Sequence, residues 1–382
     1  MAITVSKEMT TREERGEAIA KLSSQIQRVD EQIYTVKSQS GNGEYCVTKV
    51  CGEWICECPD NKYRHVKCKH IFAVELSALL RVNVAERKIE PIENLTECIH
   101  CGSSNLKRDG LRKNKTGIIQ KFYCRDCHHY FTFNIGFERM KHNPQAITSA
   151  MQLYFSGESL RNTQKSLRLL GVEVSHKTVF MWIKKYVKLM KDYVENIVPN
   201  VSDTWRADEL YVKVKGDMKY LFALMDDETR FWIAQEVAET KDRHDVRALF
   251  SKAKFLMGKQ PKNLVTDGLM TYSAGCMEVF SQAQHTRHIR FQGDMNNNKM
   301  ERMNGEIRDR EKTMRGLKTT NTPMLSGYQL YHNYIRPHEG LEGKTPSEAC
   351  GIKIEGKNKW ITLIQNASQQ TKGNRETKLT ER

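Results

Sequence analysis

Three acidic residues occupy positions where a carboxylate is expected to do chemistry. Asp208 lies inside an apolar, strand-like run that begins at Trp205, where a charge is costly unless it is paired or metal-bound. Asp267 closes a strand-like run before Gly268, and Glu301 stands 34 positions later at the start of a helical pattern. One acidic residue alone would be read as solvated surface, so the prediction rests on the joint context. We predict that Asp208, Asp267 and Glu301 are catalytic.

The chemistry that three such carboxylates support is two-metal phosphoryl transfer. Two hard cations about 3.5–4 Å apart need carboxylate oxygens from separate elements, and each ion serves one side of an in-line displacement. Oxygen ligands suit Mg²⁺, with Mn²⁺ as its substitute. The helix face that carries Glu301 continues through Asn304, Arg308 and Lys312. We therefore predict that the positive side chains of Arg308 and Lys312 bind DNA phosphates. Glu209 is expected to point to the other face, because side chains alternate along a strand.

Two cysteine-rich patterns predict two structural Zn²⁺ sites. In the first, Cys56-x-Cys58 and Cys68-x-His70 are separated by nine residues, and the pattern resembles the SWIM zinc finger. His65 is a substitute ligand, and separately buried cysteines are the alternative. The second pattern has two pairs with 22 residues between them, the spacing of a zinc ribbon; its ligands are Cys98, Cys101, Cys124 and Cys127. Neither set leaves an open position for catalysis.

Residues 144–195 read as three helices that predict a helix-turn-helix. Gly171 suits the end of the second helix, and Ser175 suits the N-cap of the third. Such a motif places the N-terminal residues of its last helix at base edges in the major groove. An ordinary helical linker is the alternative. The predicted DNA-contacting residues of this helix are His176, Lys177, Thr178, Lys184 and Lys185.

From Thr204 the pattern changes to that of a mixed-sheet α/β domain. Three strand-like runs at 205–214, 219–225 and 231–237 are followed by alternating helices and short strands, the last strand at His288–Phe291. Residues 81–97 read as a charged linker, and the polar segment 366–382 reads as disordered.

The charge distribution predicts a nucleic-acid partner. The net charge is +15, and residues 98–200 hold 17 Lys and Arg against 7 Asp and Glu. No apolar run approaches the roughly 20 residues that span a bilayer, and the N-terminus has no apolar signal core. We therefore expect a cytoplasmic protein associated with DNA and not with a membrane.

The carboxylate pattern resembles the ribonuclease-H-like core of DDE transposases and retroviral integrases. Tyr331-His-Asn-Tyr-Ile-Arg336-Pro-His338, continuing to Gly343-Lys-Thr-Pro346-Ser-Glu-Ala349, is similar to the C-terminal part of insertion-sequence transposases. The resemblance covers about residues 98–350. It implies that Asp208, Asp267 and Glu301 are the catalytic carboxylates, and that Arg308, with Arg302, contacts DNA. Transposon ends and target DNA are the implied substrates, and a homodimer or larger assembly is the implied form.

The expected architecture is a multidomain α/β protein in which small zinc modules and a helical DNA-binding domain precede the catalytic core. The expected boundaries are a SWIM-like finger at 1–90, a zinc ribbon at 98–135, a helix-turn-helix at 142–198, a ribonuclease-H-like core at 203–350 and a C-terminal tail at 351–382. The finger departs from the commonest layout of these transposases, and its partner stays open among DNA, protein and the other subunit.

Three rival functions remain at this point. A zinc-ribbon and helix-turn-helix regulator with an inactive core would bind DNA without cutting it. A resolvase-like nuclease would cut DNA without joining ends. A protein-interaction scaffold would use the SWIM-like finger. Residues 1–97, which contain the finger, have a net charge of only −1, so this alternative accounts for that module alone and not for the basic middle of the chain.

Overall fold

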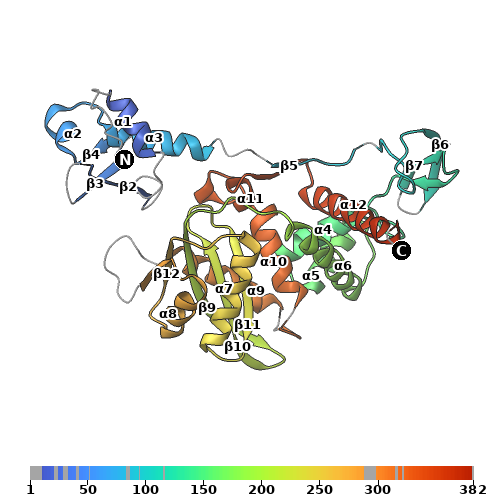
Figure 1. Ribbon diagram of the computed structural model, residues 1–382. Coiled ribbons are helices and arrows are strands. Elements are labelled where there is room, and N and C mark those ends of the chain that lie inside the picture. The colour runs from blue at the N-terminus through green and yellow to red at the C-terminus, as the bar shows by residue number, and fades with distance from the viewer. Residues whose placement is uncertain are drawn as a thin grey trace. The chain divides into compact units, whose positions relative to one another are not determined.

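The computed structural model falls into two compact units, which Figure 1 shows with their elements labelled. The first comprises residues 1–85 with 290–296, and the second comprises residues 86–289 with 297–382. The structure describes residues 11–20, 25–28, 33–39, 43–50, 52–82, 87–93, 95–114, 117–287, 298–314, 317–320 and 322–380.

The first unit is a small antiparallel sheet with helices. Its strands are β1 (Ile26–Arg28), β2 (Ile33–Lys37), β3 (Glu44–Val50) and β4 (Glu53–Cys56), and they pair in chain order. Its helices are α1 (Arg12–Ala20), α2 (Pro59–Arg64) and α3 (Lys69–Val82). Helix α1 approaches α3 closely because Gly16 has no side chain: a Cβ atom there would lie 2.6 Å from the Cβ of Phe72. The turn from β4 through α2 into α3 carries the first cysteine pattern.

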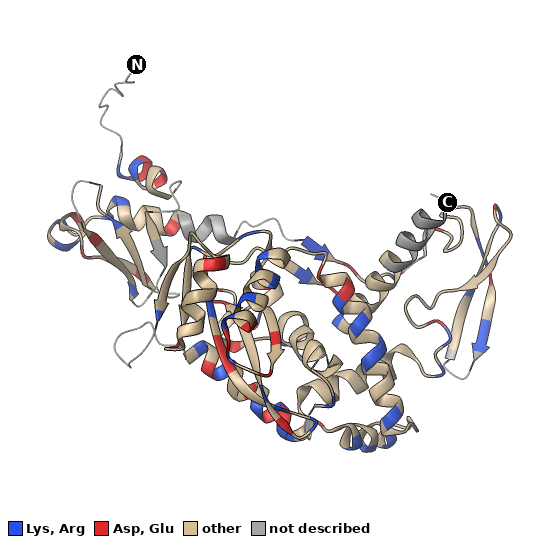
Figure 2. Cartoon of the chain, turned by 60° about the horizontal axis from the view of Figure 1, so that its bottom comes forward, with Lys and Arg blue, Asp and Glu red and all other residues tan. Residues whose placement is uncertain are grey.

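The second unit contains, in its N-terminal part, a basic hairpin with the second cysteine pattern and then three helices. Strands β6 (Leu106–Asn114), β7 (Gly117–Cys124) and β8 (Tyr130–Thr132) form an antiparallel sheet, and most of its Lys and Arg residues lie on β6, as the blue segments of this hairpin in Figure 2 indicate. Helices α4 (Pro144–Ser156), α5 (Leu160–Leu169) and α6 (His176–Val194) follow. Each begins at a side chain that accepts a backbone N–H group, namely Asn143, Ser159 and Ser175.

A five-stranded mixed sheet forms the centre of this unit. Its strands are β9 (Thr204–Val214), β10 (Asp217–Asp226), β11 (Trp232–Ala238), β12 (Asn263–Thr266) and β13 (Gln284–Arg287), in the order β11-β10-β9-β12-β13. The first three pair antiparallel, and β9, β12 and β13 pair parallel. This is the ribonuclease-H-like mixed sheet that the sequence predicts. The strand predicted at 288–291 lies outside the described residues, and β13 ends just before it.

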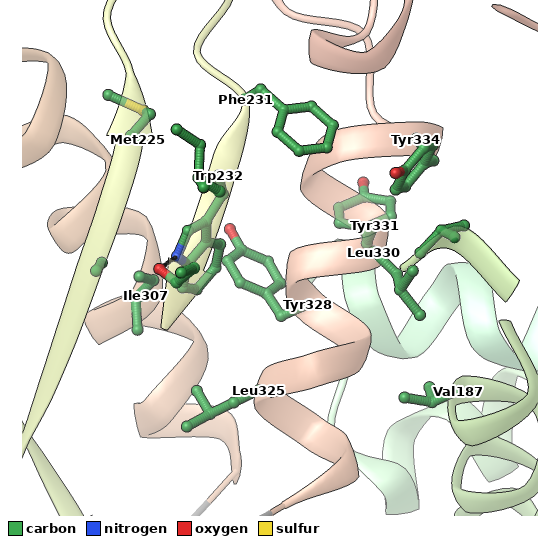
Figure 3. Packing of buried hydrophobic residues seen from close by; sticks show 14 of the residues in the cluster. Val187, Met225, Phe231, Trp232, Ile307, Leu325, Tyr328, Leu330, Tyr331 and Tyr334 are labelled. Atoms are coloured by element: carbon green, nitrogen blue, oxygen red, sulfur yellow. Dashed lines mark hydrogen bonds between the residues drawn. The ribbon is translucent and has the colours of Figure 1, made fainter. Parts of the chain in front are cut away.

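Helices flank the sheet and connect it to α4–α6. Helices α7 (Arg243–Met257) and α8 (Met270–Val279) pack together, α7 lies on β10 and β11, and α9 (Asn298–Met314) lies on β9. Helix α10 (Pro323–Leu330) continues into a π-helical turn at Tyr331–Ile335. Figure 3 shows α10 placing Leu325 and Tyr328 toward Trp232 of the sheet, with Val187 of α6 beyond it. The sheet and the three helices therefore share one hydrophobic core.

The C-terminal segment is ordered where the sequence predicts disorder. Helix α11 (Pro346–Ala349) leads to β14 (Ile352–Ile354) and α12 (Lys359–Thr380). Residues 366–380 are helical because α12 buries Trp360, Leu363 and Ile364 and packs on α6 and α4. The predicted linker at 81–97 is also partly wrong, since β5 (Arg87–Ile89) pairs parallel with β14. Among the described residues, no helix has the length and apolarity to cross a membrane.

Candidate functional site

Asp208 and Asp267 come together at the carboxyl end of β12. One carboxylate oxygen from each, together with one from Glu209, lies within 4.8 Å of the others. Asp208 sits on β9, and Asp267 is the first residue after β12. Strand β12 is hydrogen-bonded to β9 only as far as Arg206, so the two strands part just before their carboxylates. This is the edge at which parallel strands of α/β proteins build their sites.

The carboxylate of Glu209 belongs to this cluster. The prediction that Glu209 points away from the site is therefore wrong for the carboxylate group. Its Oε1 accepts a bond from Lys241 at 2.7 Å, and its Oε2 accepts one from the Tyr272 hydroxyl at 2.9 Å. Tyr272 belongs to α8, which lies across the sheet from the Asp208 side chain. Neighbouring residues of a strand direct their Cβ atoms to opposite faces, yet the carboxylate oxygens of Asp208 and Glu209 lie within 4.8 Å of each other.

The cluster has the electrostatics of a cation site. Burial, reinforced by the charges of Glu209 and Asp267 and by that of Glu301, raises the pKa of Asp208 to about 7. Burial and Glu209 also raise the pKa of Asp267, although its Oδ1 accepts the backbone N–H group of Leu269 at 3.0 Å. Crowded carboxylates disfavour their own ionisation unless a cation neutralises them. The site therefore has both the oxygen donors and the charge for a divalent metal ion.

Glu301 lies near this cluster without belonging to it. Its side chain is exposed in the first turn of α9, and it acts on Asp208 through its charge. One turn further along α9, Asn304 donates from Nδ2 to Oδ2 of Asp208 at 2.8 Å. Residues three apart share a helix face, so Glu301 is on the side of α9 that meets β9. The structure brings Asp208 and Asp267 together and holds Glu301 at the edge of the site.

Two ion-pair clusters fix the helix that carries Glu301. Lys299 donates to the backbone oxygen of Asp227 at 2.9 Å and to its Oδ1 at 3.0 Å, and Arg206 of β9 binds the same carboxylate. Further along α9, Arg336 binds Glu306 through both guanidinium nitrogens, one of them at 2.9 Å. These contacts attach α9 to the sheet and to the segment after α10.

The sequence motif around Tyr331 therefore has a positioning role. Besides Arg336, it contributes Asn333, whose Oδ1 accepts the N–H group of Trp232 at 2.8 Å and whose Nδ2 donates to the Trp232 carbonyl at 3.0 Å. Trp232 lies on β11, the edge strand of the sheet. An edge strand has unpaired backbone groups, and Asn333 satisfies two of them as a neighbouring strand would.

The first cysteine pattern forms a closed cage. Cys56, Cys58, Cys68 and His70 are all buried, and their ligand atoms lie within 4.8 Å of one another. His70 Nδ1 is 3.7 Å from Cys56 Sγ and 3.9 Å from Cys68 Sγ. Hydrogen bonds from Cys56 and His70 lower the pKa of Cys68 to about 4, which favours the thiolate form that binds metals. His65 is exposed and lies outside this cage.

The second pattern also converges. Cys98, Cys101, Cys124 and Cys127 offer ligand atoms within 4.8 Å of one another, and the Sγ atoms are 3.6 Å apart in both the Cys98–Cys127 and Cys101–Cys124 pairs. Sulfur atoms about 2.3 Å from one tetrahedral ion would lie about 3.8 Å apart. A disulfide would bring them to about 2.05 Å. Both sets thus have the donors and the spacing of a tetrahedral metal site.

The predicted DNA-contacting residues are mostly exposed. On α6, His176, Lys177, Lys184 and Lys185 are exposed, whereas Thr178 is half-buried and donates its backbone N–H group to the Ser175 cap. On α9, the exposed predicted residues are Arg302, Arg308 and Lys312, and Lys312 pairs with Asp309 at 2.9 Å.

The segment that contains the three predicted carboxylates is similar to known proteins. A family model described as a DDE domain matches residues 202–338, which contain Asp208, Asp267 and Glu301. The chain is 23% identical over 224 residues to the transposase for insertion sequence-like element IS431mec of Staphylococcus aureus (strain Mu50 / ATCC 700699); the match covers 57% of this chain and 98% of that protein. The S. aureus transposase for insertion sequence element IS257 in transposon Tn4003 matches with the same identity and coverage.

Solved structures of integrases show weaker similarity. The HTLV-2 integrase catalytic core domain in complex with magnesium is 18% identical, with a TM-score of 0.30, over 40% of this chain and 98% of that chain. A simian T-cell lymphotropic virus intasome in complex with PP2A regulatory subunit B56 gamma is also 18% identical, with a TM-score of 0.32, over 39% of this chain and 54% of that chain.

The mixed sheet carries Asp208 within β9 and Asp267 just after β12, both inside the segment that matches the DDE domain. The DDE-domain match covers this sheet, and the alignment with the staphylococcal transposases covers nearly their whole length. The match of residues 202–338 to a DDE domain and the similarity of the chain to insertion-sequence transposases support an enzyme of DNA cleavage and strand transfer. A regulator with an inactive core is not favoured.

Proposed function

We propose that Asp208, Asp267 and Glu301 together hold two Mg²⁺ ions, with Mn²⁺ as a substitute, at the DNA-cleaving site. The observation that carries this proposal is the meeting of Asp208 and Asp267 at the end of β12. The ions would supply charge for the attacking and leaving oxygens of an in-line displacement. The raised pKa of Asp208 supports the proposal, because a buried carboxyl group that resists ionisation is one that a cation stabilises.

Each residue has a distinct task in this scheme. Asp208 and Asp267 present fixed oxygens, because hydrogen bonds from Asn304 and from the N–H group of Leu269 orient them. Glu301 reaches in from the exposed first turn of α9 once the ions and DNA are present. Water attacks the phosphodiester at a transposon end and frees a 3′-hydroxyl group. That hydroxyl group then attacks target DNA, and no covalent enzyme intermediate forms.

The remaining modules would hold the DNA. We propose that His176, Lys177 and Thr178 at the start of α6 face base edges, and that Lys184 and Lys185 bind phosphates. The predicted phosphate contacts on α9, next to Glu301, are Arg302, Arg308 and Lys312. Zn²⁺ in the two cysteine sets would stabilise the finger and the ribbon, and the active form would be a homodimer or larger assembly.

The test is strand cleavage by Asp267→Asn of a DNA duplex that carries the end of the element. We expect the substitution to abolish cleavage, while zinc content and binding to the end stay unchanged. A matched control is Asp309→Asn, which removes an exposed carboxylate from α9. Cleavage by Asp267→Asn at the wild-type rate would remove Asp267 from the site. A wild-type protein that cuts the end but never joins it to target DNA would favour the resolvase-like alternative.

A further inference from the structure

Asn304 is the one amide side chain that touches the carboxylate cluster among the contacts of the described residues. It is only 3% exposed, and its Nδ2 donates to Oδ2 of Asp208 at 2.8 Å. The other oxygen of Asp208 accepts the N–H group of Glu209 at 3.0 Å. The Asp208 carboxylate is therefore held at both oxygens, which fixes its orientation toward Asp267.

The oxygen atom of the Asn304 amide group, Oδ1, is buried and has no hydrogen-bond partner among the described residues. Buried carbonyl oxygens almost always accept a hydrogen bond, so one without a partner calls for a donor or a cation that belongs to the site. The amide cannot simply turn over, because its Nδ2 must face the carboxylate of Asp208 to donate.

The position of this oxygen is set by α9. Asn304 lies one turn after Glu301 on the same side of α9, the helix that packs on β9, and it contacts Asp208 of that strand. Small divalent ions such as Mg²⁺ and Mn²⁺ keep several water ligands when carboxylates bind them, and those waters need acceptors.

We infer that Asn304 is a positioning residue of the metal site: its Nδ2 orients Asp208, and its Oδ1 accepts a hydrogen bond from the hydrated divalent ion. This inference rests on the proposed metal-binding role of Asp208 and Asp267. The sequence alone places Asn304 on the same helix face as Arg308 and Lys312 and does not distinguish its role from theirs. In the structure Arg308 and Lys312 are exposed, whereas Asn304 is buried against Asp208.

The experiment is an Mn²⁺ titration of the zinc-loaded full-length chain by calorimetry, together with the Tm of the metal-free protein. The variants are Asn304→Leu, Asn304→Ser as a smaller replacement, Asp267→Asn, and Asp309→Asn as the control on α9. Partners of metal ligands usually change affinity by about 10–100-fold. We expect that rise in the Mn²⁺ Kd for both Asn304 variants, and no rise for Asp309→Asn.

The Tm separates this role from a structural one. Leu has a similar volume and removes both the unpartnered oxygen and the donor to Asp208; these two effects oppose each other, so we expect Asn304→Leu to keep the Tm of the metal-free wild-type protein within a few degrees. Wild-type Mn²⁺ affinity in both Asn304 variants, with Asp267→Asn binding weakly, would overturn the inference and leave the proposed function intact. Equal Mn²⁺ binding by wild-type protein and Asp267→Asn would instead overturn the proposed metal site itself.

Discussion

The ion cluster at Asp227 gives a stability prediction whose size can be worked from its burial. The side chains of Asp227 and Arg206 are each 8% exposed, and Lys299 is 31% exposed. Replacing Asp227 by Asn would leave two cations facing a neutral amide. Removing one partner of a buried ion pair costs about 3–5 kcal/mol. We expect the low end, about 3 kcal/mol, because Lys299 can turn to solvent and keeps its bond to the Asp227 backbone oxygen.

The pH dependence of this loss has a definite sign. Burial alone would raise the pKa of Asp227, but Arg206 and Lys299 overcome burial and hold it below its ordinary value. A carboxyl group whose folded pKa is depressed contributes stability above its unfolded pKa of about 3.9, and that stability is lost as pH falls through the folded pKa. The difference between wild type and Asp227→Asn should therefore be full at pH 7 and shrink below about pH 4.

Urea unfolding followed by circular dichroism at pH 7 measures this difference, and the corresponding fall in Tm is roughly 5 °C for a unit of this size. The matched control is Asp203→Asn, just before β9. Asp203 also pairs with two lysines, Lys262 at 2.6 Å and Lys259 at 3.6 Å, but its side chain is 47% exposed. An exposed pair contributes about 0–1 kcal/mol. If both variants lost less than about 1 kcal/mol, burial would not be what makes the Asp227 cluster strong.

Three further predictions concern other parts of the chain. Arg336→Lys keeps the charge but not the two-point contact with Glu306. We expect the free energy of unfolding in urea to fall by about 1–2 kcal/mol and end cleavage to become slower. An unchanged free energy of unfolding and an unchanged cleavage rate would show that the two-point contact is not needed. Cys124→Ser should lower bound zinc from two equivalents to one by atomic absorption, and retention of both would exclude Cys124 as a ligand. Lys184→Ala and Lys185→Ala should each reduce the slope of log affinity for DNA against log salt concentration by about 1, whereas an unchanged slope would place these lysines away from phosphates.

The residues that the sequence could predict are those whose signal is local. The grouping of Asp208 with Asp267 follows from a local signal, because one lies within an apolar strand and the other closes one. The grouping of each cysteine set follows from the close spacing of its pairs, which is typical of metal ligands. In both cases the structure brings together what the spacing predicts.

The residues that the sequence could not predict depend on partners far along the chain. Glu209 shares the cluster with Asp267, and its partner Tyr272 lies 63 positions away in the chain. Strand β5 forms because β14, more than 260 residues later, offers it a parallel edge. In α12 the apolar spacing is present at Trp360, Leu363, Ile364 and Ala367, but these four residues are followed by polar sequence. Only the surface of α4 and α6 shows that they have something to pack against.

The position of Glu301 follows from this long-range packing more than from its own sequence context. Helix α9 is held at its start by Lys299, in its middle by Glu306, and near its end by Arg310, which donates to the backbone oxygen of Tyr154 on α4. These partners come from the sheet, from the segment after α10, and from the predicted DNA-binding helices. Because the helices and the sheet share one core, the helix that carries the predicted third carboxylate cannot shift without disturbing contacts to both, while the exposed side chain of Glu301 can still turn toward the site. We therefore expect Arg336, distant in sequence from the acidic cluster, to affect end cleavage, because it helps to fix the helix that presents Glu301.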